Sequence, residues 1–399
     1  MKKMPLEYKF FIFYNTLSVL DMYFAHWNRV PSLNVEKLRK EYTKAVKNSK
    51  NRYEFFLVMS SMMARLRNRH TWYTDRKIWQ DYGMGVGFNA IYHDKLRKWI
   101  ITSSENRKLP IGSVITKVNG ISTNKFFNSK KKYIPASNER AARNNLFSFG
   151  PYLPKSMDIE LNNKTKVHIN RTKFTNTPKE HTSCKVFKNK IGYIKIPSFT
   201  GHKFEKAALN CLNKMNGLRT IIIDLRDNDG GSTPWNLLKK LINKKWESPV
   251  YFEVVTPTAL ERQHSNINKY SQNGYYIDKN RIYKKNNYVY TSWKDAFKGK
   301  LIILTNESTL SAAEDFLIPL KYYKRAIIIG SRTNGSDGDV FFHDLDKDIF
   351  IGVGCASVRF PDGKRIEGFG ISPDIEVYPK LTDIRSKTDV VLKRALEMA

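Results

Sequence analysis

The sequence predicts a multidomain α/β (α+β) chain in which a helical region, a small β domain and an alternating α/β layer follow one another. Residues 6–69 show helical spacing only, residues 82–175 hold short strands between glycine turns, and strands and helices alternate from about 185. A chain of 399 residues exceeds one compact core. We therefore expect an N-terminal helical bundle at 1–81, a β domain at 82–178 and an α/β core at 184–399.

The first region is expected to form helices near 6–27, 34–49 and 51–68. The first helix has large apolar side chains at helical spacing: Phe10, Phe13, Tyr14, Leu17 and Leu20. We interpret this start as an amphipathic core helix, with a cleaved or anchoring leader as the alternative. No later stretch is long and apolar enough to predict a transmembrane segment.

The β domain is expected to begin with a strand led by Met84-Gly-Val-Gly-Phe88, followed by a strand at 98–101. The stretch Ile111–Gly120 predicts a further strand that ends in an Asn-Gly turn. These two glycine-containing patterns resemble a PDZ-like domain. The resemblance implies binding of an extended peptide end along a sheet edge.

The α/β layer is expected to alternate strands and helices. Its expected strands and helices are 191–196, 203–215, 219–225, 234–241, 301–304, 311–323, 326–330 and the final helix 388–398. A polar stretch rich in tyrosine and asparagine, 256–298, interrupts the layer and is interpreted as an insertion or lid with weak structure.

The chain carries 69 Lys and Arg against 37 Asp and Glu, a formal net charge of +32. This excess favours anionic partners. The lysines are spread along the sequence without a compact basic block, so no specific nucleic-acid site is expected. Cys184, Cys211 and Cys355 have no metal-ligand spacing and suggest no disulfide framework. We therefore expect no metal or other cofactor, and a reducing, cytoplasmic location is favoured, with export or membrane anchoring as the alternative.

Two stretches hold residues suited to catalysis. Ser311 lies where the expected strand 301–304 turns into a helix, so it is either an ordinary helix cap or a nucleophile backed by the Ala312 N–H group. Gly230 and Gly231 follow another buried strand and form either an oxyanion-binding turn or a plain connection, in which Asp224 and Arg226 make a structural ion pair.

Four motifs occur in order along the α/β layer. They are Asp-Leu-Arg-x-Asn-x-Gly-Gly at 224–231, Asn-x-x-Thr-x-Ser-Ala-Ala-Glu at 306–314, Gly-x-x-Thr-x-Gly at 330–335 and Glu-Gly-x-Gly-Ile-x-Pro-Asp at 367–374. Together they resemble the tail-specific or C-terminal-processing serine proteases and their relatives in the tricorn protease core and the retinoid-binding-protein repeats. The resemblance implies a ClpP/crotonase-like protease core. It also implies that Ser311 is the nucleophile and that Gly230 or Gly231, with Ala312, forms the oxyanion hole.

The resemblance also restricts the general base. One branch of the family uses a lysine at the position of Ser336, and a serine cannot replace it as a base. The branch that resembles tricorn uses a histidine and a glutamate, which match His70 and Glu367. In tricorn a serine precedes the histidine, whereas Arg69 stands there in this chain. Either Thr71 or Ser336 therefore supplies the hydroxyl relay, or the relay is absent.

The leading hypothesis is therefore a serine-type peptidase that cleaves peptides or unfolded protein tails, with acidic segments favoured by the cationic surface. The second hypothesis is a catalytically inactive relative that binds peptides or hydrophobic ligands. The third, which rests on charge alone, is nucleic-acid binding. A homo-oligomer is compatible with each of them.

Overall fold

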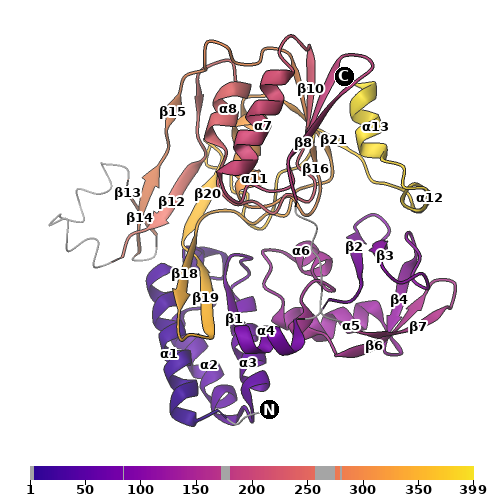
Figure 1. Ribbon diagram of the computed structural model, residues 1–399. Helices are drawn as coiled ribbons and strands as arrows, with labels where there is room; N and C mark the ends of the chain where they lie inside the picture. Colours follow the sequence, from indigo (N-terminus) through magenta and orange to yellow (C-terminus); the bar gives the residue numbers. More distant parts are fainter. Residues whose placement is uncertain (1–3, 84, 172–179, 257–274, 279–280) are drawn as a thin grey trace. The chain divides into compact units, whose positions relative to one another are not determined.

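The computed structural model describes residues 4–83, 85–171, 180–256, 275–278 and 281–399 (Figure 1). The chain groups into two compact units. The N-terminal unit comprises residues 1–177, 253–283 and 339–356, and the core unit comprises 178–252, 284–338 and 357–399. Two segments of the range that was predicted as a single core, 253–283 and 339–356, thus belong to the N-terminal unit.

The start of the N-terminal unit is helical, as expected, with helices that begin and end close to the predicted positions. These helices are α1 (Leu6–Tyr23), η1 (Trp27–Arg29), α2 (Val35–Asn48) and α3 (Arg52–Ala64). Asn34 and Asn51 cap α2 and α3 through their side chains. In α1 the predicted core residues Phe13, Leu17 and Leu20 are buried, whereas Tyr14 is 42% exposed. Among the described residues no helix combines the length and apolar character needed to cross a membrane.

A three-stranded antiparallel sheet packs with these helices and draws on the far end of the sequence. Strand β1 (Trp72–Asp75) pairs with β19 (Ile349–Gly354), which pairs with β18 (Val340–Asp344). Residues of β19 are buried in the same hydrophobic core as those of the helices. The first region is therefore not purely helical, because the apolar face of its helices is partly covered by a hairpin from 339–356.

The β domain is built on an antiparallel sheet with strand order β2-β3-β4-β6-β7. Its strands are β2 (Phe88–His93), β3 (Lys98–Ser104), β4 (Val114–Val118), β6 (Ser156–Leu161) and β7 (Lys166–Asn170), with β5 (Ile121–Ser122) paired to β4. The turn between β4 and β5 is the predicted one, with positive φ at Asn119 (50°) and Gly120 (77°). Met84, in the predicted lead to β2, lies outside the described residues.

Short helices complete this region. They are α4 (Arg76–Tyr82), α5 (Thr123–Lys130), η2 (Lys131–Tyr133), α6 (Glu139–Asn144) and η3 (Gly150–Tyr152). The side chain of Asn138 caps α6. Strand β2 is an edge strand of the sheet, and α6 contacts it.

The core unit is organised around a six-stranded sheet of order β21-β17-β16-β10-β9-β8. Its strands are β8 (Ser183–Phe187), β9 (Ile191–Lys195), β10 (Thr220–Asp224), β16 (Lys300–Thr305), β17 (Ile327–Gly330) and β21 (Ile375–Glu376). All neighbouring pairs are parallel except β8 with β9. The loops that follow β10, β16 and β17 therefore leave from the same edge of the sheet.

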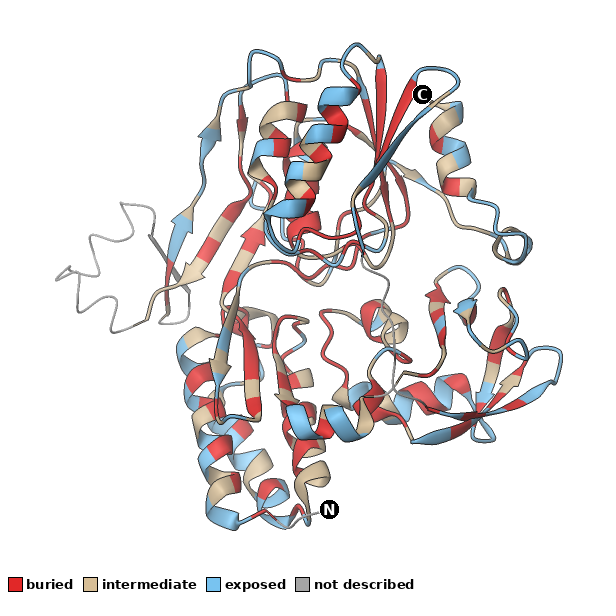
Figure 2. Cartoon of the chain, viewed as in Figure 1, coloured by how far each residue is buried: buried red, intermediate tan, exposed pale blue. Residues whose placement is uncertain are grey.

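Helices cover both faces of this sheet. They are α7 (His202–Lys214), α8 (Trp235–Leu241), α11 (Ala312–Tyr322) and α13 (Val390–Glu397). The short helix α12 (Leu381–Arg385), which has no buried residue, precedes α13 in the chain. Alternate strand residues enter two separate cores: Ile221 and Ile223 pack with α7, α8 and α11, while Ile222 packs with α13. Figure 2 shows the central strands as buried along most of their length.

The described part of the predicted insertion contains strands. Two small sheets, β11-β15 and β13-β14-β12-β20, comprise β11 (Trp246–Glu247), β12 (Val250–Val254), β13 (Tyr275–Asp278), β14 (Arg281–Asn286), β15 (Val289–Tyr290) and β20 (Ala356–Arg359). The expectation of weak structure at 256–298 is therefore wrong for β13, β14 and β15. Residues 257–274 of that stretch lie outside the described residues.

The expectation of no disulfide is also wrong. Cys184 on β8 and Cys211 on α7 form a disulfide with their Cα atoms 6.0 Å apart. Strand β8 contacts α7, which brings together two cysteines that are 27 residues apart in sequence. The spacing of the two cysteines in the sequence does not predict this disulfide, because it depends on how an edge strand packs against a helix.

Candidate active site

Ser311 is the residue between β16 and α11, and its backbone is strained. Its φ of 58° and ψ of −131° lie outside the regions that residues with a side chain ordinarily occupy. Its side chain makes no capping hydrogen bond, so the interpretation as an ordinary helix cap is wrong. The Ser311 N–H group donates to the carbonyl of Ser336 at 2.8 Å. The N–H group of Ser311 is thus engaged in a tertiary contact, and its hydroxyl makes no hydrogen bond that caps the helix.

The glycine turn lies directly against Ser311 because β10 and β16 are neighbouring parallel strands. A methyl group placed on Gly230 would lie 2.6 Å from Ser311 Cβ, so only glycine fits there without a shift of its neighbours. Asn228 fixes this arrangement. Its side-chain oxygen accepts from the Gly230 N–H group at 2.9 Å, and its carbonyl accepts from the N–H group of Leu310 at 3.1 Å.

The N–H groups of the glycine turn and of the start of α11 differ in whether a hydrogen-bond acceptor engages them. That of Gly230 is engaged by Asn228. Within the part of the chain that the structure describes, the N–H groups of Gly231 and Ala312 donate to no protein acceptor. Gly231 has a φ of 130°, a conformation that favours glycine. Ala312 is the first residue of α11, where N–H groups have no partner within the helix.

Glu314 holds the loop that follows β17, a role that sequence reasoning did not assign to it. Its side chain has no exposed surface. It accepts hydrogen bonds from the Thr333 hydroxyl at 2.5 Å and from the N–H groups of Gly335 and Ser336, both at 2.9 Å. Burial raises the pKa of this carboxyl to about 8, against the opposing effect of the three hydrogen bonds. Glu314 thereby fixes the backbone whose carbonyl accepts from Ser311.

Ser336 occupies the place of the lysine in the other branch, and its hydroxyl is enclosed. The residue has no exposed surface, and its Oγ has no hydrogen-bond partner among the described residues. A buried hydroxyl without a partner is costly in an ordinary core. Its place beside the Ser311 backbone therefore makes it a candidate for a functional contact.

Glu367 lies in a turn that is bound to the same loop. The Gly368 N–H group donates to the Gly335 carbonyl at 2.7 Å, and the Ile371 N–H group donates to the Thr333 hydroxyl at 2.6 Å. The Glu367 carboxylate is buried and accepts from the Asp337 N–H group at 3.0 Å. The structure therefore brings Glu367 into the loop network that surrounds Ser311.

Asp315 and Asp337 form a buried carboxyl pair that was not anticipated from the sequence. Burial and the neighbouring Asp315 charge raise the pKa of Asp337 well above its usual range. Asp315 accepts from the hydroxyls of Thr233 at 2.7 Å and Tyr251 at 2.8 Å. One feature of the sequence could have indicated buried carboxyl groups here: Glu314 and Asp315 stand next to each other in the first turn of an otherwise apolar helix.

His70 lies in the N-terminal unit, in a turn with a fixed backbone. The guanidinium of Arg29 donates to the carbonyls of Arg67 at 2.8 Å and Ser137 at 2.9 Å. The Arg69 N–H group donates to the hydroxyl of Ser137 at 3.0 Å. These contacts hold the chain that leads into His70, a residue that is 9% exposed.

The two residues beside His70 have partners of their own. The Thr71 hydroxyl donates to the Asn68 side chain at 2.8 Å and accepts from the Gly354 N–H group at 3.0 Å. The Arg69 guanidinium lies over the ring of Phe149, 5.1 Å from its centre. The hydroxyl of Thr71 is therefore already committed to tying β19 to this turn.

The acidic residues of the glycine turn have structural contacts. Arg226 pairs with Asp224 at 2.6 Å and with Asp389 at 2.7 Å, so the ion pair considered from the sequence is present. The Asp227 carboxylate accepts from the side-chain amide of Asn306 at 2.8 Å, and the Asp227 N–H group donates to the oxygen of that amide at 3.0 Å. These contacts join the ends of β10 and β16 around the turn.

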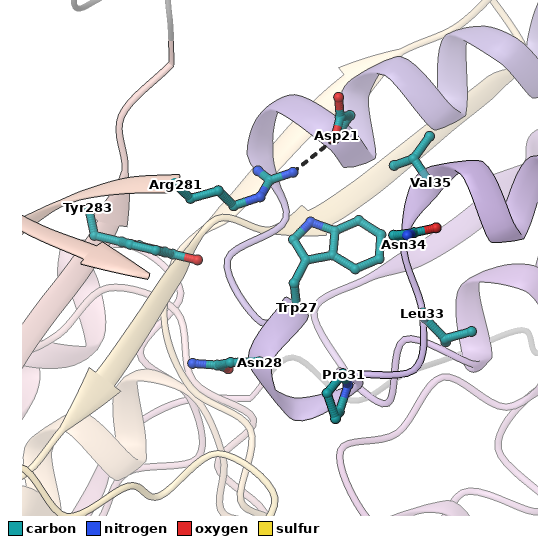
Figure 3. A pocket seen from close by; sticks show the side chains of 9 residues that line it. All are labelled: Asp21, Trp27, Asn28, Pro31, Leu33, Asn34, Val35, Arg281 and Tyr283. Atoms are coloured by element: carbon teal, nitrogen blue, oxygen red, sulfur yellow. Dashed lines mark hydrogen bonds and ion pairs between the residues drawn. The ribbon is translucent and has the colours of Figure 1, made fainter. Parts of the chain in front are cut away.

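The N-terminal unit contains a separate cavity of about 240 Å³ (Figure 3). Asp21 and Arg281 form an ion pair of 2.9 Å at its edge, and the Arg281 guanidinium lies 5.8 Å from the centre of the Trp27 ring. Its charged side chains thus neutralise each other. None of the residues predicted for catalysis lines this cavity.

Comparisons with known proteins agree with these motifs. Residues 190–377 match Peptidase family S41. The chain is 25% identical over 234 residues to the C-terminal processing peptidase, chloroplastic, of Tetradesmus obliquus, a match that covers 55% of this chain and 44% of the relative. The chain therefore spans less than half of the length of this curated relative.

Two solved structures share the fold. Mature CPAF, solved in complex with lactacystin, has a TM-score of 0.72 at 14% identity and covers 97% of this chain and 98% of its own. The tricorn protease has a TM-score of 0.53 at 16% identity and covers 98% of this chain and 36% of its own. The mixed α/β architecture of this chain is thus shared with both of these solved structures. The match of residues 190–377 to Peptidase family S41 and the similarity to a named C-terminal processing peptidase confirm the predicted resemblance to the C-terminal-processing serine proteases.

Proposed function

We propose that the chain is a serine-type peptidase that hydrolyses peptides or unfolded protein tails through an acyl-enzyme on Ser311. The observation that carries this proposal is the strained backbone of Ser311, with φ of 58° and no capping hydrogen bond, placed against the glycine turn. An ordinary cap needs no such conformation. A nucleophile presented on a strand–turn–helix connection benefits from it, because its hydroxyl is directed away from the helix backbone.

In this mechanism His70 removes the proton from the Ser311 hydroxyl as the oxygen attacks the scissile carbonyl. The imidazolium then protonates the leaving amine, and a water activated by the same histidine hydrolyses the ester. Glu367 orients the imidazole. For the intervening hydroxyl we favour Ser336, because its Oγ is buried without a partner among the described residues, whereas Thr71 is committed to Asn68 and Gly354.

The oxyanion hole in this proposal consists of the N–H groups of Gly231 and Ala312. Both are without protein acceptors in the described chain, and the two belong to the segments that meet at Ser311. Gly230 contributes space rather than a donor, since its N–H group is bound to Asn228. The absence of a Cβ at Gly230 lets the turn approach the nucleophile.

Residues 82–178 are proposed to act as a PDZ-like domain that holds the substrate, ahead of a catalytic core formed mainly by 184–399. Strand β2 is the edge of its sheet, where an extended peptide can add as a further strand. The name of the relative from Tetradesmus obliquus, a C-terminal processing peptidase, supports a peptide end as the substrate.

Labelling with a fluorophosphonate tests the proposal, because this probe reacts with an activated serine. Labelling and cleavage of an unfolded protein should be lost in Ser311→Ala. In His70→Ala both rates should fall by about 10²- to 10⁴-fold, the usual contribution of a general base. His343→Ala is the matched control, since His343 also lies in the N-terminal unit, on β18, and has no role in the mechanism.

Thermal unfolding of each variant shows whether it is folded. Folded protein that shows no Ser311-dependent labelling or cleavage would refute the peptidase and leave the alternative of an inactive binding protein. Equal rates in His70→Ala and His343→Ala would refute His70 as the base while leaving Ser311 in place.

A further inference from the structure

We propose that a cationic, aromatic-edged pocket in the core unit binds an acidic segment of the substrate peptide. The pocket has a volume of about 430 Å³, within the range of ligand sites in proteins. The proposal rests on the proposed peptidase function and adds the class of peptide that is preferred. Its residues belong to α11, to the loop after β17 and to the segment 360–372.

Positive charge dominates the lining. The cationic residues are Lys321, Arg332, Lys364 and Arg365, and Asp362 is the single acidic residue of the lining. Lys321 forms an ion pair with Asp374, which offsets its charge, so the positive charge available to a ligand comes from Arg332, Lys364 and Arg365. The side chains of Arg332, Lys364 and Arg365 are exposed, so an incoming carboxylate reaches them without a large desolvation cost.

An exposed aromatic side chain stands at the same pocket. Phe369 is 62% exposed although it is large and apolar. Its backbone is fixed on both sides: Gly368 and Gly370 have φ values of 85° and 73°, and the Phe369 N–H group donates to the Ile366 carbonyl at 2.8 Å. Beside the cationic side chains, this exposed ring offers apolar surface to a bound peptide.

The pocket is joined to the candidate active site by short stretches of fixed chain. Arg332 is adjacent to Thr333, whose hydroxyl donates to Glu314 at 2.5 Å. Phe369 follows Glu367 by two residues, and a methyl group on Gly370 would lie 2.3 Å from the Thr333 carbonyl. A peptide held here is therefore held by the same loops that surround Ser311.

These features favour a peptide over a nucleic acid. Buried Phe360 and Ile371 also line the pocket, and they suit the apolar part of a peptide next to a carboxylate. Binding of nucleic acid would call for an extended basic stripe that follows a phosphate backbone. Here the cations surround one confined pocket, and the net charge of +32 adds long-range attraction for acidic segments.

Binding is measured with the full chain carrying Ser311→Ala, by fluorescence anisotropy of two labelled peptides. One peptide contains Asp and Glu, and the other has Asn and Gln at the same positions. The acidic peptide should bind about tenfold more tightly at low salt, and Arg365→Glu should remove most of that difference. Phe369→Ala should weaken the binding of both peptides, because it removes apolar contact.

Lys294→Glu is the matched control, since this exposed lysine in the core unit carries the same charge but does not line the pocket. It should change the affinity less than twofold. Equal affinity for the two peptides, or equal losses in Arg365→Glu and Lys294→Glu, would overturn the proposal. So would a single-stranded oligonucleotide that binds more tightly than the acidic peptide and loses its binding in Arg365→Glu.

This binding experiment does not require catalysis, so its failure is distinct from failure of the peptidase proposal. In the active chain, Arg365→Glu should raise KM for the acidic peptide and leave kcat and fluorophosphonate labelling of Ser311 unchanged. A fall in kcat with unchanged KM would contradict a role in substrate binding.

Discussion

Replacement of Glu314 by glutamine tests whether this buried carboxyl holds the loop beside Ser311. Glu314 accepts hydrogen bonds from the Thr333 hydroxyl and from the N–H groups of Gly335 and Ser336. Glutamine has nearly the same shape and keeps one oxygen for the first two donors. Above about pH 8, where the Glu314 carboxyl is ionised and only accepts hydrogen bonds, the glutamine amide nitrogen would instead face the N–H group of Ser336, so two donors would meet and one hydrogen bond would be lost.

The cost follows from the number of contacts affected. Loss of one hydrogen bond and an unsatisfied buried donor give a destabilisation of about 2 kcal/mol in Glu314→Gln. Glu314→Ala removes all three hydrogen bonds and leaves a cavity, for a destabilisation of about 4 kcal/mol. At about 2–4 °C per kcal/mol, the glutamine variant should unfold about 4–8 °C below the parent.

The assay combines thermal unfolding with cleavage of an unfolded protein. Because the Ser336 carbonyl accepts from the Ser311 N–H group, a displaced loop should lower kcat by about 10²-fold. Glu376→Gln is the control, since Glu376 is an exposed glutamate on β21. The reasoning is refuted if Glu314→Gln matches this control in both unfolding temperature and kcat.

The pH dependence of stability should change in the same variant. Burial raises the pKa of Glu314 from 4.5 to about 8, so the folded chain holds this proton more tightly than the unfolded chain. This stabilisation is present in full below pH 4.5 and is lost as the pH rises to about 8. Glutamine does not titrate, so the decline in stability between these pH values should be smaller in Glu314→Gln. Identical pH profiles in denaturant unfolding would contradict the raised pKa.

Two further predictions concern the glycine turn and the disulfide. Gly230→Ala should lower kcat by at least about tenfold, because the added Cβ would lie 2.6 Å from Ser311 Cβ. Gly217 is the control position: it has a similarly positive φ but open space around it, so Gly217→Ala should affect stability alone. Equal kcat in the two variants would contradict the contact. Reduction of the Cys184–Cys211 disulfide, which joins residues 27 apart, should destabilise the chain by about 3.5 kcal/mol. Unfolding with and without reductant measures this effect, and no response to reductant would argue against the disulfide.

The sequence by itself determined most elements of the core unit. Its strands are continuous apolar runs, as at 220–224, and its helices have an apolar stripe, so local periodicity identifies both. The four motifs likewise identified Ser311, the glycine turn and Glu367 as parts of one family pattern, and the comparisons confirm the resemblance on which that pattern rests. The roles of His70 and of the oxyanion donors remain predictions, for which the experiments above are designed.

Contacts between distant segments were decided only by the tertiary structure. Pairing of β19 with β1 joins residues more than 270 positions apart, and the Cys184–Cys211 disulfide depends on how β8 meets α7. The strained φ of Ser311 follows from its tertiary contacts with Ser336 and the turn at Gly230, which no local pattern encodes. From the sequence, Glu314 is a favourable acidic residue at the start of a helix. Only the fold shows that it is buried and that its three hydrogen bonds hold the neighbouring loop beside the nucleophile.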